Sequence, residues 1–264
     1  MQTQLRLPTF SSKETKKNKY VLDGKDYWRV TSILGAINKP ALIPWRATIT
    51  LDKARRSLMA NAGKTVCIDD AFIEEIIEGA RAEPDYVLGA AQNFGSDAHY
   101  ALEQYISSGE VPNQASMYRV IGAFNQWVKD NGIEVLPQAE VTVAHSDGFA
   151  GTIDAIGTKG GELIVIDWKT GKTGGGIYPE AMLQVAAYAA ALTEATGIEV
   201  IEAHIVRFPR EEPAPDELPF NWARLDQWNL ANNFSLFRNA QHIYENVVLT
   251  AGQRKLHDGT GKIK

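Results

Sequence analysis

The chain has 264 residues, 44% hydrophobic and 22% charged, so it can bury a substantial core and is too apolar for wholesale disorder. Its apolar runs fall short of the roughly 18 residues of a membrane span, and the polar, basic N-terminus lacks the hydrophobic region of a signal peptide. A single cysteine, Cys67, excludes an internal disulfide, so we expect a cytoplasmic protein. The net charge of −5 argues against a sequence-blind nucleic-acid coat, but it suits an enzyme that holds cations near phosphates.

The first half of the chain is predicted to form a hairpin followed by helices. We expect residues 1–18 to be a flexible lead-in, and Asp23-Gly24 between two apolar stretches indicates a short hairpin. Hydrophobic periodicity predicts helices over residues 44–58, 68–80, 86–107 and 114–130. Pro84 is expected to break the chain between the second and the third of these helices.

The second half of the chain changes to alternating β-branched residues. The predicted elements are strands at 134–145, 149–158 and 162–168, a glycine-rich loop at 170–176, a helix at 178–196, strands at 199–207 and 220–224, and a helix at 226–248. This order predicts an α/β fold in which helices flank one central mixed β-sheet, with an N-terminal helical cap.

We divide the chain into an N-terminal hairpin and helical cap region (residues 1–85), which is not expected to fold independently, a core (86–248) and a flexible basic tail (249–264). Basic residues near the two ends are Lys13, Lys16, Lys17, Lys19, Arg254, Lys255, Lys262 and Lys264. They are explained either as solubilising, frayed termini or as electrostatic arms for nucleic acid.

Two apolar segments of the predicted sheet each end in a carboxylate, Asp154 and Asp167. Neighbouring antiparallel strands lie about 4.8 Å apart, so the two carboxylates can share one divalent ion, and such hard oxygen ligands suit Mg²⁺ or Mn²⁺. Because strand side chains alternate, Lys169 shares the face of Asp167, where it can stabilise charge on a phosphate or hold an attacking water. Trp168 then faces the core, and its backbone carbonyl is available as a ligand.

An ordinary ion pair between Asp167 and Lys169 is the competing explanation. A strand as apolar as residues 162–168 reads as buried on both faces, where unpaired charge is costly. A second carboxylate ends the preceding strand, and a glycine-rich loop follows at once. These three features favour an active site.

Several polar residues are candidates to complete this site. His99, on a helix face with Gly95 and Leu102, is either a packing residue or a nitrogen ligand. Glu103, one turn on, and Glu140, on the first strand of the meander, are auxiliary carboxylates, and a solvated charge is the ordinary explanation for Glu140.

Gln184 and Tyr188 are spaced four residues apart and therefore share a helix face. They either orient Lys169 or contact a substrate backbone, and an ordinary polar helix edge explains the spacing equally well.

Four motifs in this order, over roughly residues 90–207, resemble the RecB-like branch of the PD-(D/E)XK nuclease superfamily. They are Gly95-Ser-Asp-Ala-His99, Gly151-Thr-Ile-Asp154, Asp167-Trp168-Lys169-Thr170-Gly171 and Gln184-Val-Ala-Ala-Tyr188. The third and fourth look especially like those of mitochondrial genome maintenance exonucleases and phage-encoded RecB-like exonucleases.

The resemblance implies a restriction-endonuclease-like core with Mg²⁺ or Mn²⁺ as cofactor. The catalytic residues that it implies are Asp154, Asp167, Lys169, Gln184 and Tyr188. The metal ligands that it implies are His99, Asp154, Asp167 and the backbone carbonyl of Trp168. Some relatives carry an iron–sulfur cluster, which needs four cysteines, so Cys67 alone excludes it here.

The implied activity is hydrolysis of DNA phosphodiesters in recombination, repair or replication, most often by an exonuclease on single-stranded ends. DNA is then the partner, without a membrane, and any helicase or recombination protein would be a separate chain. A phage-encoded enzyme would act in the cytoplasm of its bacterial host. A structure-specific or double-strand endonuclease and a non-catalytic DNA-binding accessory protein remain alternatives.

Substrate contacts are expected from residues around the site. The helical cap would form a passage for a single strand, with stacking and phosphate contacts. Its candidate residues are Trp45, Arg46, Lys172 and Tyr178. A core position is the more ordinary explanation for Trp45.

Overall fold

The computed structural model describes residues 5–37 and 39–250. The chain divides into two compact units, one of residues 1–37 with 97–264 and the other of residues 38–96. Within the described ranges, no helix has the length and apolar character needed to cross a membrane. The basic residues predicted for the tail lie outside the described ranges: Arg254, Lys255, Lys262 and Lys264.

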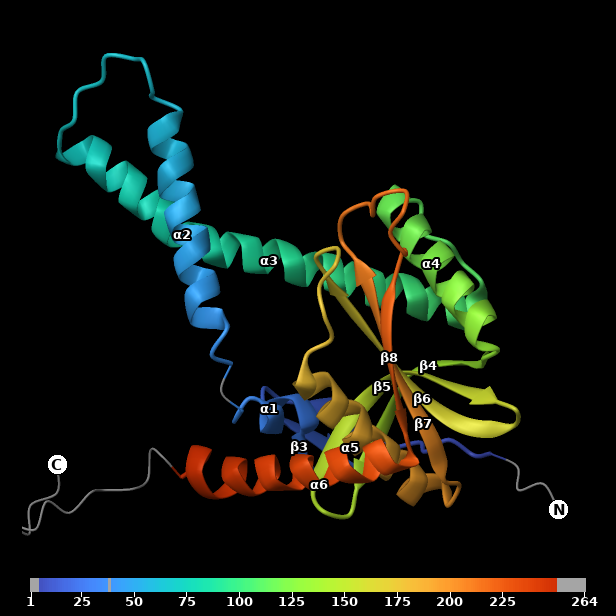
Figure 1. The fold of residues 1–264 in the computed structure, drawn as a ribbon. Coiled ribbons are helices and arrows are strands. Elements are labelled where there is room, and N and C mark those ends of the chain that lie inside the picture. Colours follow the sequence, from blue (N-terminus) through green and yellow to red (C-terminus); the bar gives the residue numbers. More distant parts are fainter. Residues whose placement is uncertain (1–4, 38, 251–264) are drawn as a thin grey trace, which may run out of the picture. The chain divides into compact units, whose positions relative to one another are not determined.

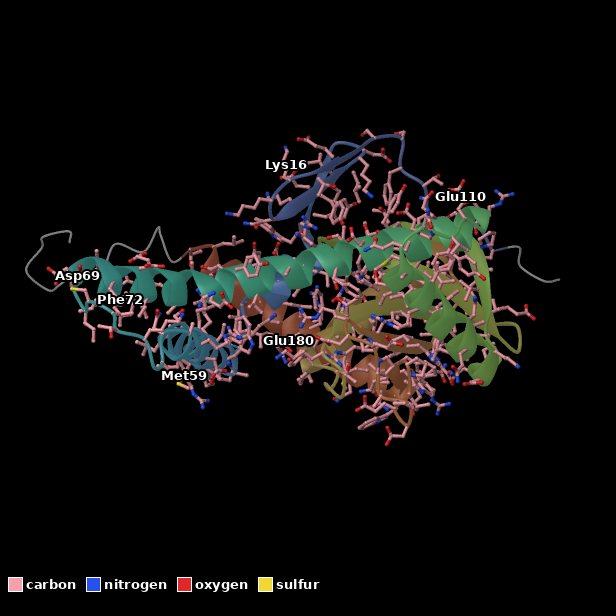
Figure 2. All side chains as sticks on the ribbon, turned by 90° about the horizontal axis from the view of Figure 1, so that it is seen from above. Lys16, Met59, Asp69, Phe72, Glu110 and Glu180 are labelled. Atoms are coloured by element: carbon pink, nitrogen blue, oxygen red, sulfur yellow. The ribbon has the colours of Figure 1, made fainter. Side chains whose placement is uncertain are left out.

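The 38–96 unit consists mainly of α2 (Leu42–Met59) and the first part of α3 (Asp70–Ser108). The carboxylate of Asp69 accepts a hydrogen bond of 2.9 Å from the backbone N–H of Phe72, two side chains labelled in Figure 2. An aspartate in this position satisfies an amide that the first helical turn leaves free. The predicted helix over 44–58 is confirmed, with slightly wider bounds.

Pro84 lies inside α3 and does not break it, so the prediction of two separate helices is wrong. Proline removes one backbone hydrogen bond, but helical turns on both sides keep their own bonds. The preceding residue, Glu83, pairs with Lys53 and Arg56 of α2 at 3.2 and 2.9 Å. These two ion pairs hold the helix to its neighbour at the point where proline weakens it.

Eight strands form a single mixed sheet in the described part of the chain. They are β1 (Lys13–Thr15), β2 (Lys19–Leu22), β3 (Lys25–Arg29), β4 (Glu134–His145), β5 (Phe149–Lys159), β6 (Glu162–Gly171), β7 (Val200–Pro209) and β8 (Asn221–Asp226). The order is β1-β2-β3-β5-β6-β7-β8, with β4 also paired to β5. The β3–β5 and β6–β7 pairs are parallel and the others are antiparallel, which confirms the predicted mixed sheet.

Helices cover both faces of this sheet, as predicted (Figure 1). Three helices of the described chain contribute to one core cluster: α1 (Val30–Leu34), α5 (Pro179–Thr196) and α6 (Gln227–Ile243). A π-helical turn, η1 (Tyr244–Val248), continues α6. On the opposite face, α4 (Ala115–Asn131) places Phe124 and Trp127 edge-on against Trp168 at 5.4 and 5.9 Å between ring centroids. Trp168 is 2% exposed, so the expected core position of its side chain is confirmed.

The predicted hairpin at Asp23-Gly24 is confirmed. Both residues have positive φ, 48° and 78°, and Leu22 pairs with Lys25 across the turn. Positive φ at both central positions is the geometry that matches the twist of the flanking strands, and glycine adopts it at little cost.

Part of the predicted flexible lead-in is ordered, so that prediction is wrong for β1. Asp23 accepts hydrogen bonds from the Ser11 hydroxyl at 2.7 Å and the Ser12 amide at 2.8 Å. Lys13 donates from Nζ to the Thr142 hydroxyl at 2.6 Å. The bonds to Asp23 hold the segment against the hairpin and the bond to Thr142 ties it to β4, and apolar alternation in the sequence gives no sign of either.

Candidate active site

The candidate site lies where β6 leaves β5. The two strands pair from Lys159 opposite Glu162 as far as Ala155 opposite Ile166, and β6 then stays on β7 alone. Near the start of β5, Ala150 pairs with Arg29 of β3. Between these pairings a pocket of about 220 Å³ opens, and it is lined by Asp154, Asp167 and Lys169 among others.

Asp154 and Asp167 therefore lie inside their strands, because β5 runs on to Lys159 and β6 to Gly171. The expectation that each strand ends at its carboxylate is wrong. Divergence of the two strands, rather than their termination, makes room for the carboxylates.

Asp154 bridges the point of divergence. Its Oδ2 accepts a hydrogen bond of 2.6 Å from the backbone N–H of Trp168. This bond satisfies an amide that β5 no longer pairs. The other oxygen, Oδ1, lies 3.4 Å from Nδ1 of His99.

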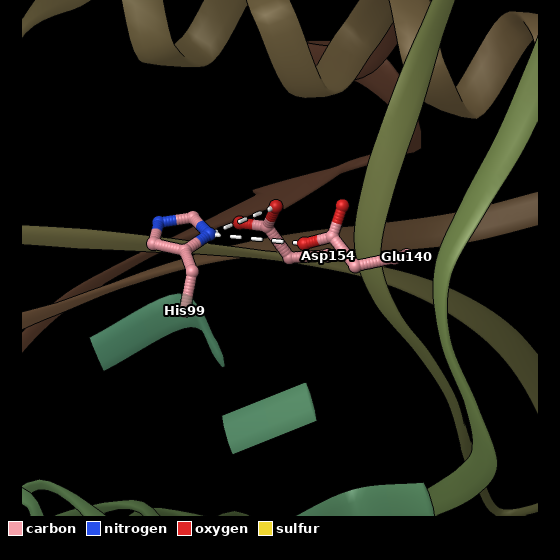
Figure 3. Close-up of side chains that lie close together, drawn as sticks. All are labelled: His99, Glu140 and Asp154. Atoms are coloured by element: carbon pink, nitrogen blue, oxygen red, sulfur yellow. Dashed lines mark ion pairs between the residues drawn. The ribbon is translucent and has the colours of Figure 1, made fainter. Parts of the chain in front are cut away.

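His99, Glu140 and Asp154 point toward one another from α3, β4 and β5 (Figure 3). One ligand atom from each lies within 4.8 Å of the other two, and His99 Nδ1 is 3.9 Å from Glu140 Oε1. Two carboxylate oxygens and an imidazole nitrogen form a donor set that suits a divalent ion such as Mn²⁺ or Mg²⁺. The residues present therefore fit the implied metal.

Glu140 lies on β4 between Ala139, which pairs with Ala155, and Val141, which pairs with Ile153, directly after an irregularity of the strand. The register of β4 on β5 shifts between Val135 and Ala139, and Glu140 has φ of 54°. A non-glycine residue in this region is strained, and such strain persists where the surrounding structure enforces it. The structure thus brings a carboxylate that the sequence offered only as auxiliary next to His99 and Asp154.

Asp167 is fully buried and has protein partners on both oxygens. Its Oδ1 accepts a hydrogen bond of 3.1 Å from Gln184 Nε2, and its Oδ2 lies 2.6 Å from Lys169 Nζ. It is outside the group of His99, Glu140 and Asp154. Direct ligation by Asp167 and by the Trp168 carbonyl stays a prediction.

Gln184 connects the lysine to the rest of the site. Its Oε1 accepts from Lys169 Nζ at 3.2 Å, while its Nε2 donates to the Tyr188 hydroxyl at 3.0 Å. Both side chains lie on α5, one turn apart, and Tyr188 is buried. Gln184 therefore limits the positions that the Lys169 ammonium can take.

Burial and neighbouring charges act together on the ionisable groups. Burial raises the pKa of Asp167 to about 6, although Lys169 opposes this shift. Burial lowers the pKa of His99, but the Asp154 carboxylate outweighs it with the help of Glu140, and the pKa rises to about 10. Burial likewise lowers the pKa of Lys169, yet Asp167 and Asp154 raise it above its usual value. The lysine is therefore cationic at neutral pH.

Gly151 lets α5 approach this part of β5. A Cβ atom at Gly151 would overlap Cε1 of Tyr188. The aromatic ring thus packs directly on the strand backbone, and the small residues Ala181 and Ala191 are buried on the same helix.

Replacing Gly151 by alanine should lower the free energy of unfolding by about 1–3 kcal/mol, because Tyr188 must move away from its place beside Gln184. Gly122→Ala is the matched control, since a Cβ atom there meets nothing within 4 Å and alanine favours its helix. Urea denaturation measures both variants. Equal stability of Gly151→Ala and wild type would contradict this packing.

The remaining predicted residues are placed as follows. Glu103 is half-buried on α3 and is not among the residues that line the pocket. Lys172 and Tyr178 are exposed in and after the glycine-rich loop. Trp45 is half-buried in the 38–96 unit, and Arg46 pairs with Asp85 in that unit at 2.8 Å. Roles of these residues in substrate binding stay predictions.

Residues of the N-terminal hairpin and α1 also line the pocket, and sequence reasoning missed them. They are Tyr20, Arg29, Val30 and Thr31. They reach it because β3 pairs in parallel with β5, Trp28 opposite Phe149 and Arg29 opposite Ala150. A pairing between segments so far apart in the chain leaves no local pattern.

A buried arginine anchors the glycine-rich loop. Arg207 donates from Nη1 to the carbonyl of Gly175 at 2.6 Å, and Asn221 donates to the same carbonyl at 3.2 Å. A Cβ at Gly171 or Gly175 would overlap the Arg207 guanidinium. Two of the loop glycines are thus explained by close approach of this side chain.

Comparison with known proteins gave a match to the PD-(D/E)XK nuclease superfamily over residues 114–254. An alkaline exonuclease (LHK-Exo) from Laribacter hongkongensis is 16% identical over 60% of this chain and 85% of that chain, with a TM-score of 0.31. Its complex with dAMP is 17% identical with the same coverage and a TM-score of 0.30. The structure of SSO0001 is 13% identical over 89% of this chain and 80% of that chain, with a TM-score of 0.33. No curated protein matches the chain.

Proposed function

The chain belongs to the PD-(D/E)XK nuclease superfamily, and we propose that it is a Mg²⁺- or Mn²⁺-dependent exonuclease that hydrolyses DNA from single-stranded ends. The observation that carries the proposal is the convergence of His99, Glu140 and Asp154 in one pocket that also contains Asp167 and Lys169. A protein that only bound DNA would have no physical need for carboxylates gathered at the phosphate site.

The metal site is assigned to His99, Glu140 and Asp154, with Asp167 and the Trp168 carbonyl as the further ligands to be tested. A divalent ion bound there supplies Lewis acidity for the scissile phosphate and lowers the pKa of a water. The hydrogen bond from the Trp168 amide fixes the rotation of the Asp154 carboxylate, which leaves Oδ1 directed at His99. Because the Asp154 side chain is already held in one orientation, it loses less conformational entropy when it binds an ion.

Lys169 provides the fixed positive charge of the site. Its ammonium lies between Asp167 at 2.6 Å and Gln184 at 3.2 Å, so it is held beside the carboxylates without a conformational search. There it orients the attacking water and neutralises charge that develops on the phosphate. Gln184 and Tyr188 act through Lys169 and Asp167, as positioning residues.

The preference for single-stranded ends rests on two supports. The carboxylates and Lys169 line a pocket of only about 220 Å³, which a single strand can enter more easily than a duplex. The motifs at His99, Asp154, Asp167–Lys169 and Gln184–Tyr188 resemble those of RecB-like exonucleases. A role in recombination, repair or replication, with a separate helicase where unwinding is needed, belongs to the same proposal.

End-labelled DNA tests the proposal directly. We expect the wild type to shorten linear single strands in Mg²⁺ or Mn²⁺, and we expect chelation by EDTA to stop the reaction. Labels at the 5′ and the 3′ end report the direction of digestion. Absence of cleavage with every metal and every substrate would overturn the enzyme assignment.

A circular single strand separates exonuclease from endonuclease activity. It offers no end, so an exonuclease leaves it intact while it degrades the linear form of the same sequence. Efficient cutting of the circle, or faster cutting of a branched duplex than of the linear strand, would replace the exonuclease proposal by an endonuclease.

A further inference from the structure

Arg29 is the last residue of β3, and its side chain lines the pocket. It lies outside residues 114–254, the part of the chain that matches the superfamily. Its Nε is buried and has no hydrogen-bond partner within the described residues. Its guanidinium Cζ lies 5.5 Å from the centre of the Tyr20 ring. The Arg29 side chain therefore has an N–H group at the wall of the pocket that is free to donate a hydrogen bond to a ligand.

A buried N–H without a partner is costly, so it marks a place where a ligand acceptor would be favourable. The guanidinium group is planar and always charged, and it presents donors in a fork that matches phosphate geometry. Tyr20 holds the plane from one side by a cation–π contact, and its hydroxyl lies 3.0 Å from Thr152 Oγ1 of β5. The donor is thus held in place before any ligand arrives.

The position of Arg29 in the sheet indicates which phosphate it can reach. Its backbone is paired with Ala150, four residues before Asp154 on β5. Four residues of a strand span roughly 13 Å, and both side chains line the same pocket. An anion at Arg29 therefore lies beside the metal group and does not coincide with it.

We propose that Arg29 donates hydrogen bonds to a non-bridging oxygen of the phosphate next to the scissile one in a bound DNA strand. The hairpin that precedes the superfamily core thereby becomes part of the substrate-binding wall. This inference rests on the proposed function, because it takes the substrate to be a phosphodiester chain.

The test compares Arg29→Gln with wild type in binding to a fluorescent single-stranded oligonucleotide, measured by anisotropy in EDTA so that no cleavage occurs. We expect Arg29→Gln to bind about 10-fold more weakly or worse. The slope of log affinity against log salt should become shallower by about 0.7, which corresponds to one lost phosphate contact on a single strand. Arg29→Lys should fall between the two, because it keeps the charge and loses the fork.

Lys25→Gln is the matched control. It removes one positive charge from the same strand, but Lys25 is exposed and is not among the residues that line the pocket. We expect its salt slope to equal that of the wild type. If all variants have the same thermal unfolding midpoint, the difference in DNA affinity comes from the lost contact and not from a loss of folded protein.

Oligonucleotides that carry one neutral methylphosphonate at successive positions locate the contact. The wild type should lose affinity most strongly at one linkage, and Arg29→Gln should show no further loss at that linkage. If both proteins respond alike at every linkage, or if Arg29→Gln binds as tightly as wild type, the inference is wrong. A wild type that cleaves DNA while Arg29→Gln binds normally would reject the inference alone, whereas a wild type that cleaves nothing would reject the proposed nuclease.

Discussion

Lys169→Ala is expected to lower the single-turnover rate of DNA cleavage by about 10³-fold at saturating Mn²⁺, a loss typical of removing one preorganised charge-stabilising group. Its ammonium lies 2.6 Å from Asp167 and 3.2 Å from Gln184, so its position does not depend on the substrate. Alanine removes the charge and leaves water in its place, and water does not supply a fixed positive charge. Quenched-flow gels with end-labelled single strands measure the rate.

Loss of the lysine also leaves the carboxylate of Asp167 without its cation, and Asp167 is fully buried. Removing one partner of a buried pair commonly costs about 3–5 kcal/mol, so thermal unfolding must accompany the kinetics. Lys169→Arg keeps a cation beside Asp167 and serves as the folded comparison. Lys129→Ala, an exposed lysine on α4, is the matched surface control. If Lys169→Ala is folded and cleaves at the rate of the wild type, Lys169 has no part in the chemistry.

Strong local signals made much of the fold predictable. The Asp23-Gly24 turn and the alternation in β5 and β6 gave strands and turns close to those observed. The same alternation places Trp168 in the core and Asp167 with Lys169 on the other side of β6, against Gln184 of α5. These features depend on residues that are neighbours in the chain or in a hairpin.

Features that depend on distant parts of the chain were not predictable. The parallel pairing of β3 with β5, which brings Arg29 to the pocket, joins segments that are separated in the chain by α1, α2, α3, α4 and β4. The register of β4 on β5 shifts between Val135 and Ala139, and Glu140 directly after it has a positive φ that a non-glycine residue rarely adopts, so local sequence does not signal this geometry. Pro84 shows the same limit, because the ion pairs of Glu83 with α2 support a helix that the local rule would end.

Asp154→Asn should weaken Mn²⁺ binding by at least about 100-fold, more than the 10- to 100-fold usually lost when a group behind a ligand is removed. The Trp168 amide donates a hydrogen bond of 2.6 Å to Asp154, and the side-chain oxygen of asparagine can still accept it. The negative charge that faces His99 is lost. Calorimetric titration of the DNA-free protein with MnCl₂ measures the affinity. An unchanged titration would remove Asp154 from the metal site.

Glu140→Gln in the same titration decides between the two ligand sets. The grouping of Glu140 with His99 and Asp154 predicts that Glu140→Gln, which removes the charge of a direct ligand, weakens Mn²⁺ binding about as much as Asp154→Asn does. A larger loss for Asp167→Asn, with Glu140→Gln unchanged, would instead favour the set implied by the motifs. Glu134→Gln, an exposed carboxylate on the same strand, controls for the general loss of one negative charge. Ion binding by Glu140 would also give its strained φ of 54° a functional explanation, so the titration tests that explanation as well.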